Sequence, residues 1–178
     1  MRRLSVILCL FTVFAVPAAA LAGLGNSSDG SLVVKNGTAP YNPGDTTPSA
    51  NVPVVQLTIT GSVIGQVVGT GKLVIDAGPT ATADAEPIVT GAGLPSDSPR
   101  SDTAQVWKGS SFKFRAVGGA YTVLVYGDRV NLVAVGTGTV RLAGTPDSAT
   151  DGRYSLNGND FVSLPGVQTD KRFIGANG

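Results

Sequence analysis

The stretch VIGQVVGTGKLVI, residues 63–75, sets two short aliphatic runs on either side of a glycine-rich quartet, Val68–Gly71. The same quartet, VGTG, returns as Val135–Gly138, again between aliphatic runs. Glycine between two strand-like runs marks a tight turn, a bulge or a close approach of two backbones. Both quartets are therefore predicted to be structural corners of a β fold.

A nucleotide-binding role for the quartets is excluded by their neighbours. A phosphate-binding P-loop needs a glycine five residues before its Gly-Lys pair and a Ser or Thr after it, but Gln66 and Leu73 occupy those positions. The dinucleotide-binding pattern also fails, because Val74 and Arg141 stand where its third glycine belongs. A repeated structural corner is the interpretation that survives.

Most of the chain has the composition and the alternation of β-strands. Val55–Thr60 and Phe112–Arg115 alternate apolar and polar residues, and Glu86 is the single glutamate. A period of two residues indicates strands with one buried face, and no helical period of eleven residues or more occurs beyond the N-terminal segment. Strands are expected near residues 31–35, 53–60, 62–68, 71–76, 86–90, 104–108, 111–117, 120–126, 129–135, 138–143, 152–156 and 171–174.

Two segments are predicted to be loops because Pro, Ser, Asp and Gly dominate them: Thr38–Asn51 and Gly93–Asp102. The first is long enough to be either a flexible spacer or a functional surface loop. The second would join two similar halves, roughly residues 30–93 and 104–160.

The similarity of the two halves rests on coincident glycines. An offset of 67 residues superposes Gly69 on Gly136, and an offset of 66 superposes Gly61 on Gly127. A one-residue bulge or loop change would explain the step between the two offsets. An internal duplication is favoured over a coincidence of composition.

The N-terminus has the form of a secretory signal. Arg2 and Arg3 precede an apolar run that is followed by small residues ending in Ala20-Leu21-Ala22. Residues 1–22 are therefore predicted to be a cleaved signal peptide, and residues 23–178 one secreted, extracellular domain without membrane insertion. The loss of two arginines leaves 11 basic against 12 acidic residues, a net charge of −1. That charge is not basic enough to attract nucleic acid.

The mature segment has neither His nor Cys, because the single cysteine lies within the signal. The usual nucleophile triads, thiol chemistry and most zinc sites are thereby excluded. Paired carboxylates for glycoside hydrolysis remain an option, with the candidates Asp76, Asp84, Glu86, Asp128 and Asp151. Most of these adjoin Gly or Ala, where aspartate is an ordinary turn residue. We therefore expect no enzyme activity, no catalytic residue and no bound cofactor.

Two weaker candidate sites remain. The run from Asp151 to Asp160 includes Asn157 and Asn159, whose oxygens with those of the two aspartates suit calcium. Asn157-Gly158 is also a typical hairpin turn, and the plain hairpin is favoured. Trp107, the only tryptophan, would suit sugar stacking if exposed, although a single tryptophan entering a strand is more often part of the core.

The second half, from WKGSSFKFR at Trp107 to YSLNG at Gly158, resembles small secreted proteins of high-GC Gram-positive bacteria. The resemblance implies secretion and no particular activity, because that group has none assigned. The Pro-rich loop Thr38–Asn51 departs from the pattern of the group.

The predicted fold is all-β, an antiparallel sandwich or closed barrel of about 10–12 short strands. Three functional hypotheses follow. The first is a non-enzymatic extracellular or cell-envelope protein that binds an extracellular protein or helps to build a layer, for which an exposed edge strand or apolar patch is expected. The second is a module that binds a cell-surface glycan or calcium. The third, an Asp-dependent hydrolase, would need two carboxylates converging in a cleft.

Overall fold

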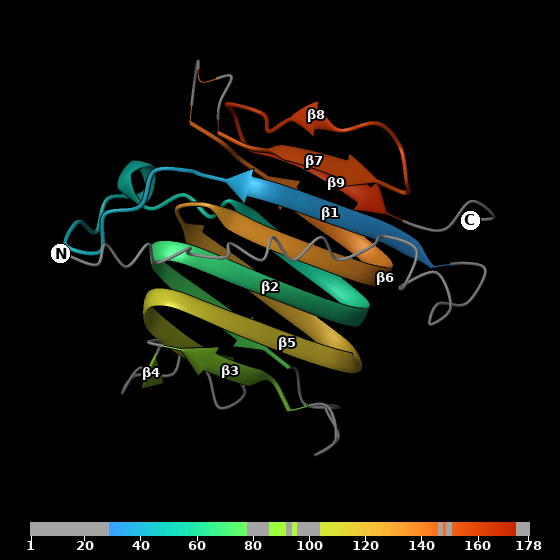
Figure 1. Ribbon diagram of the computed structural model, residues 1–178, viewed down its shortest axis with the longest axis horizontal. Helices are drawn as coiled ribbons and strands as arrows, with labels where there is room; N and C mark the ends of the chain where they lie inside the picture. Colours follow the sequence, from blue (N-terminus) through green and yellow to red (C-terminus); the bar gives the residue numbers. More distant parts are fainter. Residues whose placement is uncertain are drawn as a thin grey trace, which may run out of the picture.

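The computed structural model describes residues 29–77, 86–91, 94–95, 104–145, 148 and 151–173. They form nine antiparallel strands and one short 3-10 helix (Figure 1), so the predicted all-β fold is confirmed. The strands are β1 (Gly30–Gly37), β2 (Val55–Asp76), β3 (Ile88–Gly91), β4 (Leu94–Pro95), β5 (Ala104–Gly127), β6 (Val130–Leu142), β7 (Arg153–Leu156), β8 (Val162–Ser163) and β9 (Thr169–Phe173). The 3-10 helix, η2, spans Pro48–Ala50.

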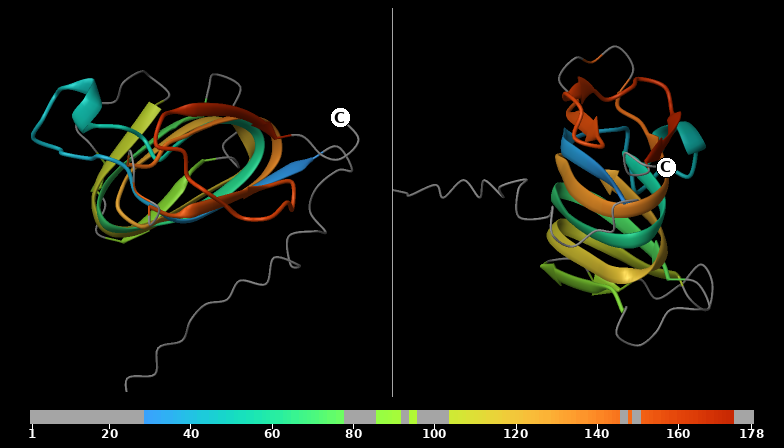
Figure 2. Two further views of the ribbon diagram at one scale, coloured as in Figure 1. Left: turned by 90° about the horizontal axis from the view of Figure 1, so that it is seen from above. Right: turned by 90° about the vertical axis from the view of Figure 1, so that its right-hand side faces the viewer.

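Three long strands, β2, β5 and β6, wind round the molecule and build both layers of a sandwich (Figure 1). Layer A consists of residues 55–60 and 71–76 of β2, 104–109 and 120–127 of β5, and 137–142 of β6, with β4 and β9. Layer B consists of β1, residues 63–67 of β2, 112–116 of β5 and 130–135 of β6, with β3, β7 and β8. Seen from above, these strands trace an elongated ring (Figure 2). Of the two predicted architectures, the sandwich is therefore the one observed.

Rows of paired glycines mark the corners where the long strands cross between the layers. Gly61 of β2 pairs with Gly136 of β6 and with Gly119 of β5. A Cβ atom on Gly136 would collide with the carbonyl oxygen of Thr60 and would lie 2.9 Å from the Cα atom of Gly61. Because a real Cβ needs more room than this, β2 and β6 can approach each other this closely only where both residues are glycine.

The opposite corner is built in the same way. Gly71 of β2 pairs there with Gly109 and Gly127 of β5, and a Cβ on Gly71 would lie 2.7 Å from the carbonyl oxygen of Tyr126. Each VGTG quartet thus contributes a glycine to a corner, Gly71 in one and Gly136 in the other. The chain continues as a strand through both quartets, so they are bends within strands and not turns between them.

The core fills the space between the two layers. The alternate residues of the long strands that face inward are buried, as the sequence period predicts. The largest fully buried side chains are Phe112, Leu32, Leu57, Ile59, Leu73, Ile75, Leu132 and Leu142. The core is therefore a single aliphatic and aromatic cluster shared by both layers.

The described residues form nine strands where about 10–12 are expected, because short runs join. The predicted strands 53–60, 62–68 and 71–76 are one strand, β2, and those at 104–108, 111–117 and 120–126 are one strand, β5. The predicted strands 129–135 and 138–143 likewise form β6. Glycine bends the backbone at each predicted break without ending the hydrogen-bond ladder, so the chain turns a corner where the sequence suggests a loop.

The halves aligned by the sequence follow similar paths. Residues 57–75 and 123–142 each start in layer A, pass through layer B and return to layer A. One residue separates Gly61 from the next buried valine, Val63, whereas two separate Gly127 from Val130, which accounts for the step between the two offsets. That a duplication produced this likeness stays a prediction.

Some predictions fall outside the described residues. These are the signal peptide, residues 1–22, the candidate carboxylate Asp84, and all of the loop 93–102 except residues 94–95. Within the described ranges, no helix has the length and apolar character needed to span a membrane.

Candidate functional site

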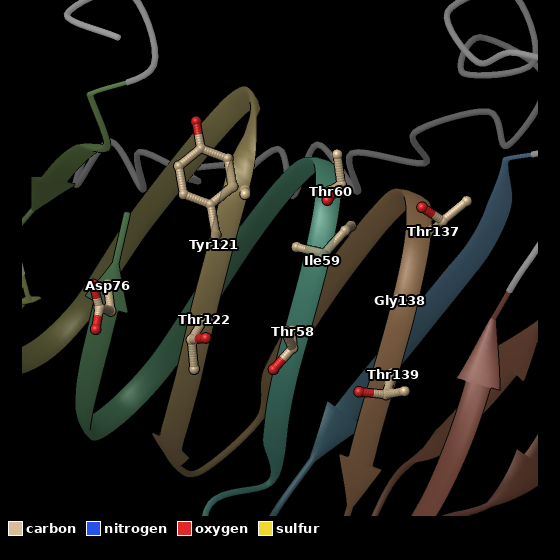
Figure 3. A pocket seen from close by; sticks show the side chains of 10 residues that line it. Thr58, Ile59, Thr60, Asp76, Tyr121, Thr122, Thr137, Gly138 and Thr139 are labelled. Carbon is tan, nitrogen blue, oxygen red and sulfur yellow. The ribbon is translucent and has the colours of Figure 1, made fainter. Parts of the chain in front are cut away.

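The outer face of layer A carries a shallow depression of about 400 Å³, which we call the threonine groove (Figure 3). Its lining comes from four neighbouring strand segments, two of β2 and one each of β5 and β6. The lining residues are Thr58, Ile59, Thr60, Asp76, Ala120, Tyr121, Thr122, Thr137, Gly138 and Thr139. Since Ile59 and Tyr121 are buried, the accessible side chains of the groove are mainly those of threonines, which offer both methyl and hydroxyl groups.

Strand register arranges the hydroxyl groups in rows. Thr122, Thr58 and Thr139 are successive cross-strand partners, and Asp76 pairs with Thr122 at one end of this row (Figure 3). Two residues along the strands, Ala120, Thr60 and Thr137 make a second row. Because neighbouring strands lie about 4.8 Å apart and alternate residues share one face, the two rows form a regular grid.

The local sequence explains the grid. The segments Thr58-Ile59-Thr60 and Thr137-Gly138-Thr139 each place two threonines on the outward face, with the middle residue turned inward. A Cβ on Gly138 would collide with the carbonyl oxygen of Thr58. Glycine at this position therefore lets β6 lie close against β2. Threonine is β-branched, so its few rotamers hold the hydroxyl groups in restricted directions.

A second cluster of side chains, the covered half, borders the groove on the same face. Val74, Val106 and Tyr126 are buried there although they point away from the main core. The segment Thr38–Asn51 supplies their cover, because the Tyr41 ring lies 5.9 Å from the Tyr126 ring. Lys72 closes the cluster, with its Nζ 3.8 Å from the centre of the Tyr126 ring.

The structure of the segment Thr38–Asn51 accounts for its polar sequence. The Asn42 Oδ1 atom accepts a hydrogen bond from the Gly44 amide, and the Asp45 carboxylate accepts bonds of 2.8 Å from the Thr47 amide and hydroxyl. Tyr41 and Asn51 close the segment with an isolated bridge. Its turns thus hold Tyr41 over layer A, a role that its Pro-rich composition did not indicate.

Burial also affects the Tyr41 phenol. Desolvation, with a smaller contribution from neighbouring Tyr126, raises the pKa of Tyr41 above its ordinary value. The phenol is therefore neutral at physiological pH, as a group packed on an apolar surface should be.

On its other side, the groove meets the charged strand β9. Arg141 donates bonds of 2.7 Å and 2.9 Å to the two carboxylate oxygens of Asp170. This contact with Arg141 lowers the pKa of Asp170, chiefly through the hydrogen bond. Arg172 pairs with Thr139 and so continues the threonine row onto β9. A second depression of about 340 Å³ lies here, lined by Thr139, Arg141, Asp170, Lys171 and Arg172.

Trp107 belongs to the core, and the hypothesis that it forms an exposed sugar-stacking platform is wrong. Its side chain is only 6 % exposed and packs in the main core cluster. Trp107 pairs with Leu73, whose side chain is fully buried between the layers. The alternation of β5 therefore turns the ring inward.

The calcium candidates do not converge. Asp151 accepts hydrogen bonds of 2.7 Å from the Thr145 amide and the Ser148 hydroxyl. Asn157 lies at the other end of β7, where its Oδ1 accepts a bond of 3.1 Å from the Ser31 amide. A strand rises about 3.3 Å per residue, so the two side chains are separated by well over 10 Å. They cannot ligate one ion, for which oxygens within about 2.6 Å are needed.

The predicted hairpin accounts for the rest of this run. Asn157 and Gly158 have φ angles of 53° and 75°, and the Asn159 amide donates to the Leu156 carbonyl. Two successive positive φ angles are the signature of a type I′ turn, for which Asn-Gly is the preferred pair. Asn159 and Asp160 are exposed beyond the turn. Across the described ranges, no three His, Cys, Asp or Glu side chains gather as a metal site would require.

The outer face of layer B has a different character. Val133, Ile64, Arg115 and Ile88 are successive cross-strand partners, and Ile64 and Ile88 are 50 % and 47 % exposed. Gln66, Lys113 and Thr90 form a polar row beside them. The exposed apolar surface expected for a protein-binding role is thus present as a narrow row that Arg115 interrupts.

Sequence reasoning missed the threonine groove. Its signal was the pair of T-x-T segments at residues 58–60 and 137–139, each inside a predicted strand. The register that brings them side by side depends on the glycine corners, which the sequence indicated without specifying partners. Comparisons with protein-family models, with curated proteins and with solved structures gave no match to this chain.

Proposed function

We propose that this chain is a secreted, non-enzymatic protein of the extracellular space or cell envelope that binds a glycan through the threonine groove. The signal-like residues 1–22 support export, and the net charge of −1 that follows cleavage gives no reason to expect nucleic acid. The binding partner in this proposal is a hydroxyl-rich chain that lies across the strands of layer A.

One observation carries the proposal: five threonine hydroxyls form an accessible grid over three neighbouring strands. Thr58, Thr60 and Thr139 are exposed, and Thr122 and Thr137 are half-buried. Each hydroxyl can donate one hydrogen bond and accept two, which matches the mixed donors and acceptors of a sugar. The γ-methyl groups between them give apolar contact for the C–H surfaces of the ligand.

Rigidity adds to this match. The threonines lie on the central strands of a sandwich and not on loops, so little conformational freedom remains to be lost on binding. Their rotamers are restricted by β-branching. A weakly binding hydroxyl group can then contribute most of its hydrogen-bond energy to the complex.

Binding, and not hydrolysis, is the better account of this groove. Glycoside hydrolysis requires two carboxyl groups on opposite sides of the scissile bond, whereas Asp76 is the one carboxylate among the residues that line the depression. Asp128, in contrast, lies in the exposed turn between β5 and β6. Glu86 is exposed just before β3.

A protein partner on layer B is the weaker alternative. The row of Ile64 and Ile88 is one residue wide, is interrupted by Arg115 and adjoins a polar row. Patches that mark protein interfaces are usually contiguous over several hundred Å². Layer B therefore serves as the control surface for experiments on layer A.

The proposal is tested with the variant Thr58→Val/Thr139→Val, which removes two hydroxyls and keeps the branched shape. Thr90→Val is the matched control, because Thr90 is an exposed strand threonine on layer B. Soluble dextran and polygalacturonate, titrated by calorimetry, are the probes. We expect binding of at least one probe and a loss of about thirtyfold in the double variant, since each of the two neutral hydrogen bonds contributes about 1 kcal/mol.

Threonine methyl resonances locate the bound probe independently of affinity. The signals of Thr58, Thr122 and Thr139 should move on addition of the probe, and that of Thr90 should not. Binding that is unaffected by the double variant, or that moves only layer B signals, would overturn the proposal.

A further inference from the structure

The two depressions on layer A meet at a shared residue. Thr139 lines both the threonine groove and the smaller depression beside β9. The cross-strand row Asp76, Thr122, Thr58, Thr139, Arg172 therefore runs without a break from a carboxylate to a guanidinium group. Five positions at about 4.8 Å spacing make a track of about 19 Å.

The charges at the β9 end are not equivalent. Arg141 is held by both oxygens of Asp170, so this pair presents little net charge to a ligand. Lys171 and Arg172 are exposed, and neither forms an ion pair with any acidic side chain in the described ranges. Arg172, the partner of outward-facing Thr139, therefore stands at the end of the hydroxyl row with no anion assigned to it. Lys171 pairs with Val140, whose side chain is buried, so strand alternation places Lys171 on the opposite face of β9.

We propose that the ligand of the groove is an anionic glycan or polyol chain, and that Arg172 binds its carboxylate or phosphate group. This inference rests on the proposed function, because the neutral part of the same chain would occupy the threonines. Arginine suits the role, since its planar guanidinium group offers paired donors to carboxylate and phosphate oxygens.

The distance between Asp76 and Arg172 bears on the orientation of the bound ligand. Asp76 stands about 19 Å from Arg172 along the row, more than twice the Debye length of about 8 Å at physiological ionic strength. An anion at the β9 end is therefore hardly repelled by Asp76. The ligand should bind with its charged group over β9.

Because the chain carries almost no net charge, an anionic ligand is attracted only by the charge at the β9 end of the row. With a net charge of −1 after signal cleavage, long-range attraction of polyanions is not expected. Binding should therefore need both the hydroxyl row and Arg172, and added salt should weaken it modestly, in proportion to one charge and not to many.

The test uses the chain without residues 1–22 and three probes: neutral dextran, polygalacturonate with carboxylates, and poly(glycerol phosphate) with phosphates. The variant Arg172→Gln removes the charge at the end of the hydroxyl row. Arg115→Gln is the matched control, because it removes an arginine that is exposed on layer B. Calorimetric titrations are run at two salt concentrations.

We expect at least one anionic probe to bind about fivefold more tightly than dextran, as for one exposed ion pair. Arg172→Gln should lose most of that preference, while the control keeps it. A preference for polygalacturonate would identify carboxylate as the recognised group, and a preference for poly(glycerol phosphate) would identify phosphate.

Two failures are distinguishable. If dextran binds as tightly as both anionic probes and binding depends on Thr58 and Thr139, the proposed function stands and this inference is wrong. If anionic probes bind equally well to Thr58→Val/Thr139→Val, or respond equally to both charge variants, the groove is not the site and both proposals fail.

Discussion

Two neighbouring regions of layer A are built on the same strands, but another segment of the chain covers one of them and leaves the other accessible. In the covered half, Tyr126 and Val74 are buried beneath Tyr41. In the threonine groove, a few residues along β5 and β2, Thr58 and Thr60 are exposed. The two regions lie on the same face of shared strands and differ in their outward side chains, which are apolar in one and threonine in the other.

The difference explains the role of the segment Thr38–Asn51. Outward aliphatic and aromatic residues on a sheet need a cover, because each buried apolar side chain contributes roughly 1.5–3 kcal/mol. Outward threonines need none, since water or a ligand can satisfy their hydroxyls. The segment Thr38–Asn51 covers the outward apolar side chains and leaves the outward threonines accessible.

The largest expected effect comes from the corner on which both regions depend. Gly136→Ala places a Cβ against the Thr60 carbonyl oxygen at a backbone φ of 149°. The clash and the backbone strain together should lower the free energy of unfolding by about 3–5 kcal/mol. Chemical denaturation followed by Trp107 fluorescence measures this change.

Gly118→Ala is the control for backbone strain without a clash. Gly118 has a φ of 69°, and a Cβ at this position would meet nothing within 4 Å. Its cost should be only about 1 kcal/mol. Equal costs at the two glycines would mean that close approach of β2 and β6 does not determine the corner.

The next effect separates the covered half from the groove. Tyr126→Ala removes a side chain that is 5 % exposed and should destabilise the fold by about 3 kcal/mol. Thr122→Ala, four residues earlier on β5 and within the groove, should cost less than about 1 kcal/mol. Equal losses in denaturation midpoints would show that the two regions do not differ in packing.

How far the sequence predicts this molecule follows from particular residues. Alternation in Val55–Thr60 and Phe112–Arg115 predicts strands and buried faces correctly, because a period of two reports burial directly. Asn157-Gly158 predicts its hairpin turn because the φ angles required are local. Both predictions succeed because burial alternation and turn φ angles depend on residues that are adjacent in the sequence.

The candidate site was not predictable to the same degree. The threonines of 58–60 and 137–139 are 77 or more residues apart, and only the crossing at Gly61 and Gly136 brings them together. Nothing in either segment specifies that partner. The burial of Trp107 was the favoured alternative, because a single tryptophan entering a strand is more often part of the core.

A smaller effect is expected from alkaline pH. The raised pKa of Tyr41 means that the folded state favours the neutral phenol. The corresponding stabilisation is complete below the ordinary tyrosine pKa of about 10 and is lost as pH rises through the raised value. In absorbance titrations, Tyr41→Phe should therefore remove one late-ionising tyrosine, while Tyr121, also raised chiefly by desolvation, continues to ionise late. An unchanged late phase would mean that Tyr41 is not covered by packing on Tyr126.

The smallest expected effect is the most informative about the groove. Thr58→Val/Thr139→Val replaces exposed hydroxyls by methyl groups on strand positions that favour β-branched residues. If these hydroxyls serve a ligand and not the fold, the free energy of unfolding should change by less than about 0.5 kcal/mol. Denaturation in guanidinium chloride measures this, with Thr90→Val on layer B as the control variant. A loss of stability much larger than that of Thr90→Val would mean that the threonine row bonds within the protein, and the distinction between a covered half and a binding half of layer A would no longer hold.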